Sequence, residues 1–590
     1  MAPQLSHSGS RFLARGTPVP GEAAAGDHLQ AEYHLWLVGH QLSNGHAPWR
    51  DPYTFRPESP PRWNFGGWPF GLVFWPLDAL LGHVRAWNLF LLLTYLAAGA
   101  FAYLWLRELA LPAAAAAFGG LVFALEPYRV AQSAGHLRGP ISALLPLALW
   151  ALERGRRGSR WWYVGAGAAL ASIPFSDVHL ALGAIPFFLL YALCRGAWLG
   201  GALATLPALG AALLVGNYST SGIGSGGRSL REVAHYSATG LDFVTRHPRH
   251  GLESFVFLGW LAPLLALVGL AVLARARRWW LVAVLAVGAF VPMLLALGTH
   301  FPLYSTLWHH FPPLRYPRVP ERQMPVACLA LAALAAFAVA RLRWVLVVAL
   351  LVLVAADLRV SIYEAAAAQP GRRAYEGLRA PGRLLELPVL HPNVHLGSIY
   401  LWYDQVARRE RPGGYSTIAP ESAARLSLRL AELNCGDWRR DDDALLRRLG
   451  VRYVAFHRGL AGETGWFAWQ GLLDHGFGQV ARDDGVTMLE RGRSGGSSPV
   501  PEPSKRVVFC EGWQGGSPRY RHAAFWTRGQ ARVRLTTSDP VHVTLSIKGR
   551  PVHSLRVTRP VSIRIGRAGW WLLGVDIDRA DRGLRVTVTR

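Results

Sequence analysis

Apolar residues are gathered into long runs between about residue 86 and residue 358. Most of these runs are about 15 to 22 residues long, and a helix of that length can cross a hydrocarbon core of about 30 Å. The pattern predicts about ten membrane-spanning helices, several of them short enough to be tilted or kinked. Their approximate bounds are 86–106, 112–126, 139–153, 161–175, 179–194, 197–216, 254–273, 279–297, 323–340 and 344–358.

The connections between these runs alternate in character. Short loops that carry positive charge stay in the cytoplasm. Every second connection is a short turn with arginine: Arg107, the turn from Arg154 to Arg160, Arg195, the turn from Arg275 to Arg278, and the turn from Arg341 to Arg343. The other connections are richer in Gly, Pro, His and aromatic residues, and we expect them on the outer face: 126–139, 174–179, 217–253 and 298–322. Polar chemistry is therefore expected on that face.

The chain after the last predicted span differs from the membrane region. Residues 370 to 492 mix short strand candidates, such as 451–456, with helical stretches, such as 421–433, which is typical of an α/β domain. After residue 505 alternating segments recur every 8 to 12 residues or so, which predicts a small β-sandwich. The predicted organisation is a first exported loop with interfacial amphipathic helices (1–85), a multi-span domain (86–360), an exported α/β domain (361–492), a linker (493–504) and a β-sandwich (505–590).

Composition agrees with a membrane protein. Hydrophobic residues make up 51% of the 590 residues, charged residues only 17%, and the mean hydropathy is +0.19. The net charge of +25 does not form a basic stripe with interleaved aromatic residues, so nucleic acid is not an expected partner. Four cysteines in so long a chain exclude a disulfide scaffold. Since His and Cys do not cluster with zinc-ligand spacing, no metal site is predicted.

The first exported loop contains the first candidate for chemistry. Asp27 precedes a segment in which apolar and aromatic residues recur at helical spacing, as in a helix that lies in the membrane interface. The carboxylate of Asp27 could act as a general base or could cap this helix, and the two roles are compatible. Glu32, Asp51 and Glu58 are alternative bases in the same loop.

Several outer-loop motifs together carry a resemblance. They are Gly26–Asp27 ahead of the amphipathic segment, the loop 46–49 (His-Ala-Pro-Trp), 127–129 (Pro-Tyr-Arg) followed by 135–137 (Gly-His-Leu), 175–177 (Phe-Ser-Asp), and 315–322 (Arg-Tyr-Pro-Arg-Val-Pro-Glu-Arg). Over about residues 26 to 360 the chain resembles bacterial members of the GT-C superfamily of polytopic glycosyltransferases. The resemblance implies that an acidic residue of the first exported loop is the base, which maps to Asp27. It also implies that the donor is a sugar on a polyprenyl phosphate.

Transfer of a sugar from a lipid phosphate also needs cations for the leaving group. The outer-face arginines that could bind the donor phosphate are Arg315, Arg318, Arg322, Arg129 and Arg138. Each of them could instead contact lipid headgroups or a helix end. Asp177 and His136 are further candidates. Asp177 lies between two apolar segments, where an acid is costly unless it faces a wet cavity, although it could also cap the next helix.

We therefore expect a multi-pass protein of the bacterial plasma membrane with exported C-terminal domains. It would transfer a sugar from a polyprenyl-phosphate donor to a glycan or protein acceptor of the cell envelope, with membrane lipid as a further partner. A transporter or lipid-moving protein, and a non-catalytic glycan assembly factor, are the alternatives. The sequence does not decide whether a divalent metal is required, because members of the resembled superfamily differ in this respect.

Two further expectations follow from the predicted topology. Cys435 and Cys510 are the only cysteines outside the apolar runs, and an oxidising compartment would join them in a disulfide, with two free thiols as the alternative. Residues 1 to 85 are expected outside, yet residues 1 to 25 contain no apolar run of signal length. In the resembled superfamily a membrane helix directly precedes the acidic loop residue, so we expect that the natural protein begins upstream of Met1.

Overall fold

The computed structural model describes residues 9–219, 221–248, 251–363, 367–368, 372–510, 513–514, 517–518, 521–547, 550–565, 569–578 and 583–589. The chain forms two compact units. The first unit contains Met1–Thr17, Ala24–Asp51 and Arg62–Gln369, and the second contains Pro18–Ala23, Pro52–Pro61 and Pro370–Arg590. Two short pieces of the N-terminal segment 1–85 therefore fold with the C-terminal region, which the sequence pattern does not indicate.

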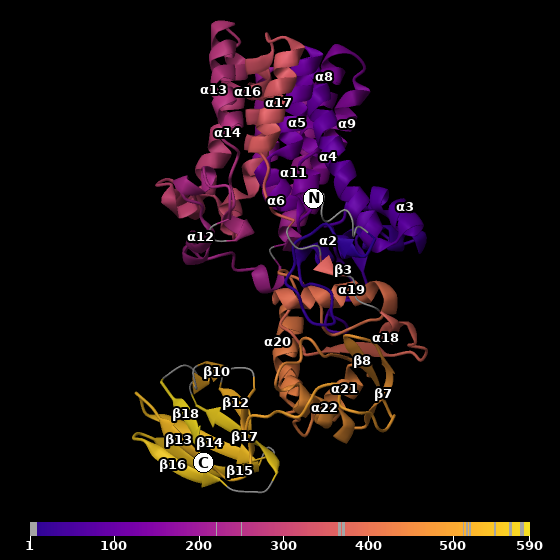
Figure 1. Ribbon diagram of the computed structural model, residues 1–590, viewed down its shortest axis with the longest axis vertical. Coiled ribbons are helices and arrows are strands. Elements are labelled where there is room, and N and C mark those ends of the chain that lie inside the picture. Colours follow the sequence, from indigo (N-terminus) through magenta and orange to yellow (C-terminus); the bar gives the residue numbers. More distant parts are fainter. Residues whose placement is uncertain are drawn as a thin grey trace. The chain divides into compact units, whose positions relative to one another are not determined.

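The first unit is helical, and each of the ten predicted apolar segments contains a helix. These helices are α4 (His83–Glu108), α5 (Ala113–Leu125), α8 (Leu144–Arg157), α9 (Trp161–Ser176), α10 (Val178–Cys194), α11 (Trp198–Ser219), α13 (Leu261–Arg275), α14 (Trp279–Ala296), α16 (Met324–Val339) and α17 (Trp344–Asp357). Figure 1 shows them running alongside one another, and neighbouring pairs such as α9 and α11, α4 and α5, and α13 and α16 pack together.

The structure does not confirm a count of ten spans. Among the described residues, four helical segments are long and apolar enough to cross a membrane: His83–Glu108, Trp198–Ser219, Trp279–Ala296 and Pro320–Val339. Five shorter apolar helices accompany them: Gly71–Leu81, Ala113–Leu125, Val178–Cys194, Leu261–Arg275 and Trp344–Asp357. A helix such as α5, with 13 residues, is only about 20 Å long, less than the hydrocarbon thickness. Local apolar runs thus predict where the helices are better than they predict how many of these helices cross the membrane.

Helix α16 lies at the centre of the first unit. It is built mainly from Ala, Leu and Val, and almost all of its side chains are buried. The neighbouring helices approach it closely: a Cβ atom added at Gly269 of α13 would lie 1.9 Å from the carbonyl oxygen of Leu334. Small residues allow such close helix packing in membranes, where van der Waals contact stabilises the bundle.

The arginine-bearing connections meet at one end of this bundle. Nη1 of Arg157, at the end of α8, lies 2.9 Å from a carboxylate oxygen of Glu108, at the end of α4. Nε of Arg195, after α10, lies 2.6 Å from a carboxylate oxygen of Glu153 on α8. The connections that alternate in character along the sequence thus lie at alternate ends of the bundle. Short elements occupy the opposite end of the bundle in Figure 1: α2 (Asp27–Ser43), α3 (Gly71–Leu81), α6 (Pro127–Ser133) and α12 (Leu230–Tyr236).

The second unit begins with an α/β part. Its sheet has the order β5-β6-β8-β7, formed by β5 (Arg383–Leu387), β6 (Val451–His457), β8 (Val486–Arg491) and β7 (Phe477–Arg482). Strands β5 and β6 are parallel and the other neighbours are antiparallel. The helices are α18 (Arg373–Glu376), α19 (Ser398–Ala407), α20 (Glu421–Leu430), α21 (Asp442–Arg448) and α22 (Gly465–Asp474).

The remainder of the second unit is a two-sheet β structure. The larger sheet has the order β15-β14-β17-β12-β9 and the smaller one β16-β13-β18. Their strands are β9 (Val507–Phe509), β12 (His522–Arg528), β13 (Ala531–Thr536), β14 (Val541–Ile547), β15 (Arg550–Val557), β16 (Val561–Ile565), β17 (Trp570–Ile577) and β18 (Arg585–Thr589). Buried residues alternate along several strands, for example along β13, as in a sandwich whose inner faces form the core.

A buried charged network fixes one of the N-terminal pieces in the second unit. Both ring nitrogens of His457 pair with carboxylates: Nδ1 lies 3.2 Å from Glu22, and Nε2 lies 2.8 Å from Glu386. The hydroxyl of Tyr403 also donates to Glu22, at 2.8 Å. Burial lowers the pKa of His457, but the two carboxylates outweigh burial and raise it to about 9. Glu22 is therefore bound to the core of the α/β part.

Candidate functional site

Asp27 is the first residue of helix α2, and its carboxylate is partly exposed. The cap residue is Gly26, which provides no side-chain cap hydrogen bond. Asp27 is therefore not the cap that the alternative interpretation expects. Its Oδ2 atom lies 2.9 Å from Nε2 of His136, which comes from the loop after α6. The loop lies directly against the start of α2, since a Cβ atom added at Gly135 would make van der Waals contact with the Cβ of Asp27, at 3.7 Å.

Asp177 lies between α9 and α10 and has two roles. Its Oδ1 atom accepts hydrogen bonds from the backbone N–H groups of His179 and Leu180, so it caps α10. Its Oδ2 atom lies 2.5 Å from Nε of Arg138. Burial would raise the pKa of Asp177, but the Arg138 guanidinium and the neighbouring groups hold it well below its usual range. Both charges of this pair therefore persist at neutral pH.

Arg322 extends this cluster towards the last outer connection. Its Nη1 atom lies 2.9 Å from Nδ1 of His179. It also interacts electrostatically with Arg138 and Asp177. Arg138 and Arg322 thus place two positive charges around Asp177, and Glu321 and Glu253 also interact electrostatically with Arg322.

Arg318 brings the positive charge close to Asp27. Its guanidinium pairs with Glu253 and lies over the ring of Tyr236, 4.7 Å from the ring centroid. Burial lowers the pKa of Arg318, but Glu253, Tyr236 and Asp27 outweigh burial and raise it. Glu253 also interacts electrostatically with Arg322. We call Arg138, Arg318 and Arg322 the arginine group. They come from two outer connections that are far apart in sequence.

The structure does not bring the other two predicted arginines to this group. Arg129 is fully buried and donates to Ser142, to the carbonyl of Ala124 and to the carbonyl of Thr94. Arg315 donates to the carbonyls of Trp308 and His309. Both guanidinium groups thus form hydrogen bonds that hold nearby backbone carbonyls in place.

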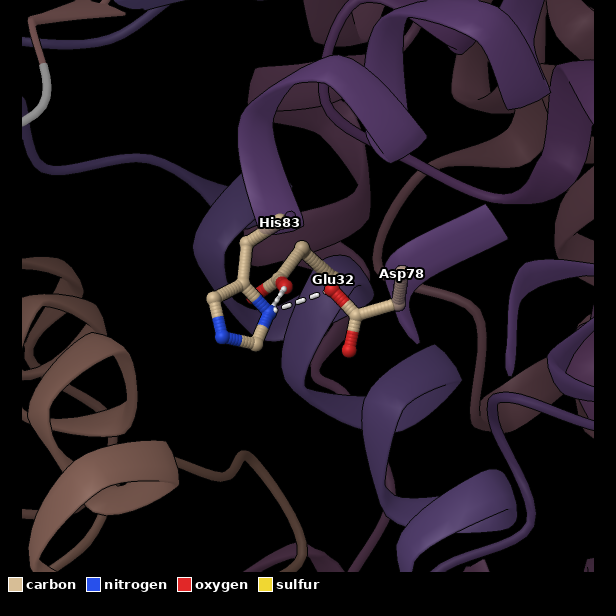
Figure 2. A group of neighbouring side chains, drawn as sticks. All are labelled: Glu32, Asp78 and His83. Carbon is tan, nitrogen blue, oxygen red and sulfur yellow. Dashed lines mark ion pairs between the residues drawn. The ribbon is translucent and has the colours of Figure 1, made fainter. Parts of the chain in front are cut away.

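Among the described contacts, none of the alternative bases of the first loop pairs with His136. Asp51 is buried and accepts a hydrogen bond from the hydroxyl of Tyr33 at 3.0 Å. Glu32 is buried beside Asp78 and His83, as Figure 2 shows. Glu58 belongs to the second unit. Of the predicted bases, Asp27 is therefore the one that pairs with His136.

Sequence reasoning missed two acids and a histidine of this cluster: Glu253, Glu321 and His179. Glu321 is 1% exposed, and Arg138 and Arg322 act on it electrostatically. Glu321 could have been found from its place in the 315–322 motif, directly before Arg322. Glu253 could have been found as an acid at the end of the long 217–253 connection. His179 is hidden in an apolar run, and only the pairing with Arg322 distinguishes it.

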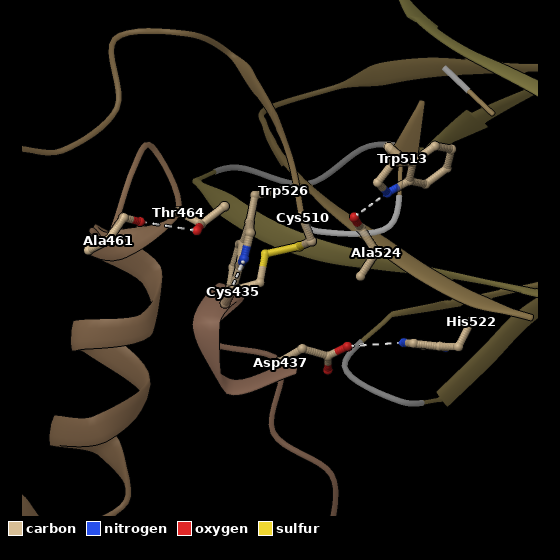
Figure 3. The surroundings of a disulfide bond; sticks show 9 residues. All are labelled: Cys435, Asp437, Ala461, Thr464, Cys510, Trp513, His522, Ala524 and Trp526. Atoms are coloured by element: carbon tan, nitrogen blue, oxygen red, sulfur yellow. Dashed lines mark hydrogen bonds and ion pairs between the residues drawn. A yellow bond between two sulfur atoms is a disulfide. The ribbon is translucent and has the colours of Figure 1, made fainter. Parts of the chain in front are cut away.

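Cys435 and Cys510 form a disulfide, as the topology predicts (Figure 3). It joins the end of the α20 region to the sandwich. The indole N–H of Trp526 donates to the carbonyl of Cys435 at 2.7 Å, and His522 lies 3.1 Å from Asp437. Hydrogen bonds to Asp437 and Asp576 raise the pKa of His522 to about 10. The disulfide is thus one of several contacts between the two parts of the second unit.

No protein-family model matches the chain, and no curated protein sequence matches it. Solved structures are similar to it. Arabinofuranosyltransferase AftD from Mycobacteria has a TM-score of 0.47 and 14% identity, over 100% of this chain and 60% of that chain. Archaeal oligosaccharyltransferase AglB from Archaeoglobus fulgidus, in complex with an inhibitory peptide and a dolichol-phosphate, has a TM-score of 0.45 and 11% identity, over 95% and 92%. ArnT from Cupriavidus metallidurans, bound to undecaprenyl phosphate, has a TM-score of 0.36 and 14% identity, over 80% and 94%.

The first of these proteins is named as an arabinofuranosyltransferase and the second as an oligosaccharyltransferase. The chain spans about 60% of the length of AftD. The chain is similar to these proteins in fold. The function proposed below is argued from the residues of this chain.

Proposed function

We propose that this protein is a glycosyltransferase of the bacterial plasma membrane, which transfers a sugar from a polyprenyl-phosphate donor to a cell-envelope acceptor. The observation that carries the proposal is the arrangement around Asp27: a partly exposed carboxylate paired with His136, in electrostatic contact with Arg318. Asp27 and the arginine group belong to the outer connections of the first unit, where a lipid donor and an envelope acceptor would meet.

Asp27 acts as the general base. The hydroxyl oxygen of the acceptor attacks the anomeric carbon, and its proton passes to the Asp27 carboxylate as the new glycosidic bond forms. The bond between the anomeric carbon and the phosphate oxygen breaks, and the polyprenyl phosphate leaves with that electron pair. His136 orients the carboxylate through the 2.9 Å contact.

The arginine group stabilises the negative charge that develops on the phosphate. Arg318 is the member in electrostatic contact with Asp27, so it is assigned to the donor phosphate. Arg322, which interacts electrostatically with Arg138 and Asp177, adds a further positive charge near the same anion. Fixed cations at a partly dry site stabilise a developing charge more strongly than water does. The exported second unit would bind or guide the acceptor.

Mass spectrometry of envelope glycans and lipid-linked sugars from a strain that lacks the protein tests the class. We expect a polyprenyl-phosphate sugar to accumulate and a matching glycan to be missing. Complementation with Arg318→Ala should fail, while Arg315→Ala should restore the glycan, because the guanidinium of Arg315 contacts Trp308 and His309 of its own loop. This pair is matched in residue type and loop.

The two alternatives predict other results. A lipid-moving protein would leave its lipid-linked sugar on the cytoplasmic leaflet, and the purified protein would not form a glycosidic bond in detergent solution. A non-catalytic assembly factor would tolerate the loss of Asp27. Formation of product by the purified protein from a polyprenyl-phosphate sugar would exclude both.

A further inference from the structure

Three side chains from three helices of the first unit meet at one point (Figure 2). Glu32 lies on α2, Asp78 on α3, and His83 is the first residue of α4. Nδ1 of His83 lies 3.2 Å from Oε1 of Glu32 and 2.8 Å from Oδ1 of Asp78. One ring nitrogen therefore faces two carboxylate oxygens at once.

The local fold holds these side chains together. Gly82 separates α3 from α4 and has a φ angle of 74°, which a glycine adopts without strain. The sharp turn brings Asp78 and His83 to the same side. Helix α2 packs closely on α3: an added Cβ atom at Gly71 would lie 2.4 Å from the Cβ of Val38. This close contact holds Glu32 against the turn.

We infer that Glu32, Asp78 and His83 form a binding site for a divalent transition metal, with Zn²⁺ as the preferred ion. An imidazole nitrogen and two carboxylate oxygens are typical ligands of Zn²⁺, and a water molecule would complete a tetrahedron. Zn–N and Zn–O bonds of about 2.1 Å at tetrahedral angles separate neighbouring ligand atoms by about 3.4 Å. The observed separations of 2.8 and 3.2 Å are comparable.

Charge also favours a metal at this site. The side chain of Glu32 is fully buried, while those of Asp78 and His83 are 16% and 20% exposed. Among these three side chains, two carboxylates and one imidazolium sum to a net charge of −1, and buried charge is costly unless it is balanced. A divalent cation with neutral His83 leaves no net charge. The exposed edges of Asp78 and His83 provide an entry path for the ion.

A second group of His and carboxylate side chains is less suited to a metal. Glu432, Asp437 and His522 also place ligand atoms close together. However, the guanidinium of Arg439 already binds Glu432, and Asp576 lies 2.6 Å from the other ring nitrogen of His522. A cation there would have to compete with Arg439. The second group therefore provides a matched histidine control.

The metal site goes beyond the proposed transferase activity, since binding of the ion does not require sugar transfer. It would join α2, which begins with Asp27, to α3 and α4. The ion would thus hold the helix that carries the proposed base without touching the reacting atoms. Glu32, Asp78 and His83 are positioning residues in this arrangement.

Metal analysis of the full-length protein tests the inference. The protein is purified in detergent without a histidine tag, stripped with EDTA, incubated with Zn²⁺ and desalted. Elemental mass spectrometry should then find that wild type holds about one more zinc ion per chain than His83→Gln and Asp78→Asn. His522→Gln should retain the wild-type zinc content. Co²⁺ in place of Zn²⁺ should give visible d–d absorption in wild type that the His83→Gln variant lacks.

A second readout guards against misfolding of the variants. Zn²⁺ should raise the unfolding temperature of the stripped wild type and leave that of Asp78→Asn unchanged, because ligands stabilise only the state that binds them. The inference is overturned if stripped wild type takes up no Zn²⁺, if His83→Gln takes up as much as wild type, or if the zinc is lost with His522→Gln instead. Sugar transfer is not measured, so these outcomes do not depend on the proposed function.

Discussion

Replacement of Asp27 by Asn is the sharpest test of the proposed base. Asn keeps the size and hydrogen-bonding ability of the side chain but cannot accept the proton of the acceptor hydroxyl. General-base catalysis contributes about 10²- to 10⁴-fold to a rate. At about 1.4 kcal/mol for each factor of ten, the substitution should raise the activation barrier by about 3 to 5 kcal/mol.

The same substitution should change stability much less. The helix is capped at Gly26, so no side-chain cap hydrogen bond is lost. The Asp27–His136 pair is partly exposed, with side-chain exposures of 27% and 29%. Such pairs contribute about 0 to 1 kcal/mol, and loss of a negative charge in the first turn of a helix costs about 0.3 to 1 kcal/mol. Transfer should therefore fall far more than stability.

The assay compares purified wild type and Asp27→Asn in nanodiscs. Initial rates of transfer from a polyprenyl-phosphate sugar are measured by mass spectrometry, and unfolding is followed by tryptophan fluorescence. We expect a decrease of 100-fold or more in kcat with a nearly unchanged unfolding temperature. Transfer by Asp27→Asn at close to the wild-type rate would refute the assignment and direct attention to Glu32 or Asp51.

The remaining predictions concern the second unit. The Cys435–Cys510 disulfide closes a loop of 75 residues, which stabilises the folded state by about 4 kcal/mol in the chain-entropy treatment; Cys435→Ser should lower the unfolding temperature, and labelling of two thiols of this unit in the unreduced protein would contradict the bond. The pKa of His457 is raised from 6.5 to about 9, so its stabilisation, about 3 kcal/mol, is complete below pH 6.5 and is lost as the pH rises through 9. Unfolding temperatures measured from pH 6 to 10 should show this decrease in wild type, and His457→Gln should abolish it; equal pH dependence of the two proteins would show that His457 is not the group responsible.

The sequence by itself determined the elements and their alternation. Each of the ten apolar segments contains a helix, because burial of an apolar run in lipid or in a helix bundle depends on local composition. The strands that begin at residues 383, 451 and 486 also follow from local apolar runs. The arginine-bearing turns share one end of the bundle, because a chain that runs up and down through neighbouring helices leaves every second turn at the same end.

Only the tertiary structure decided which polar side chains meet. Arg129 and Arg138 are nine residues apart in one outer connection, yet Arg129 is directed to backbone carbonyls inside the bundle and Arg138 to Asp177. The sequence likewise does not indicate that residues 18–23 and 52–61 belong to the second unit. The partner of a charged side chain depends on the packing of helices that are distant in sequence, and hydrophobic periodicity records only which face of an element is buried. Asp27 was found from its loop, but His136 and Arg318 became its neighbours only through the folding of two separate connections, and Glu253 joins the cluster through Arg318.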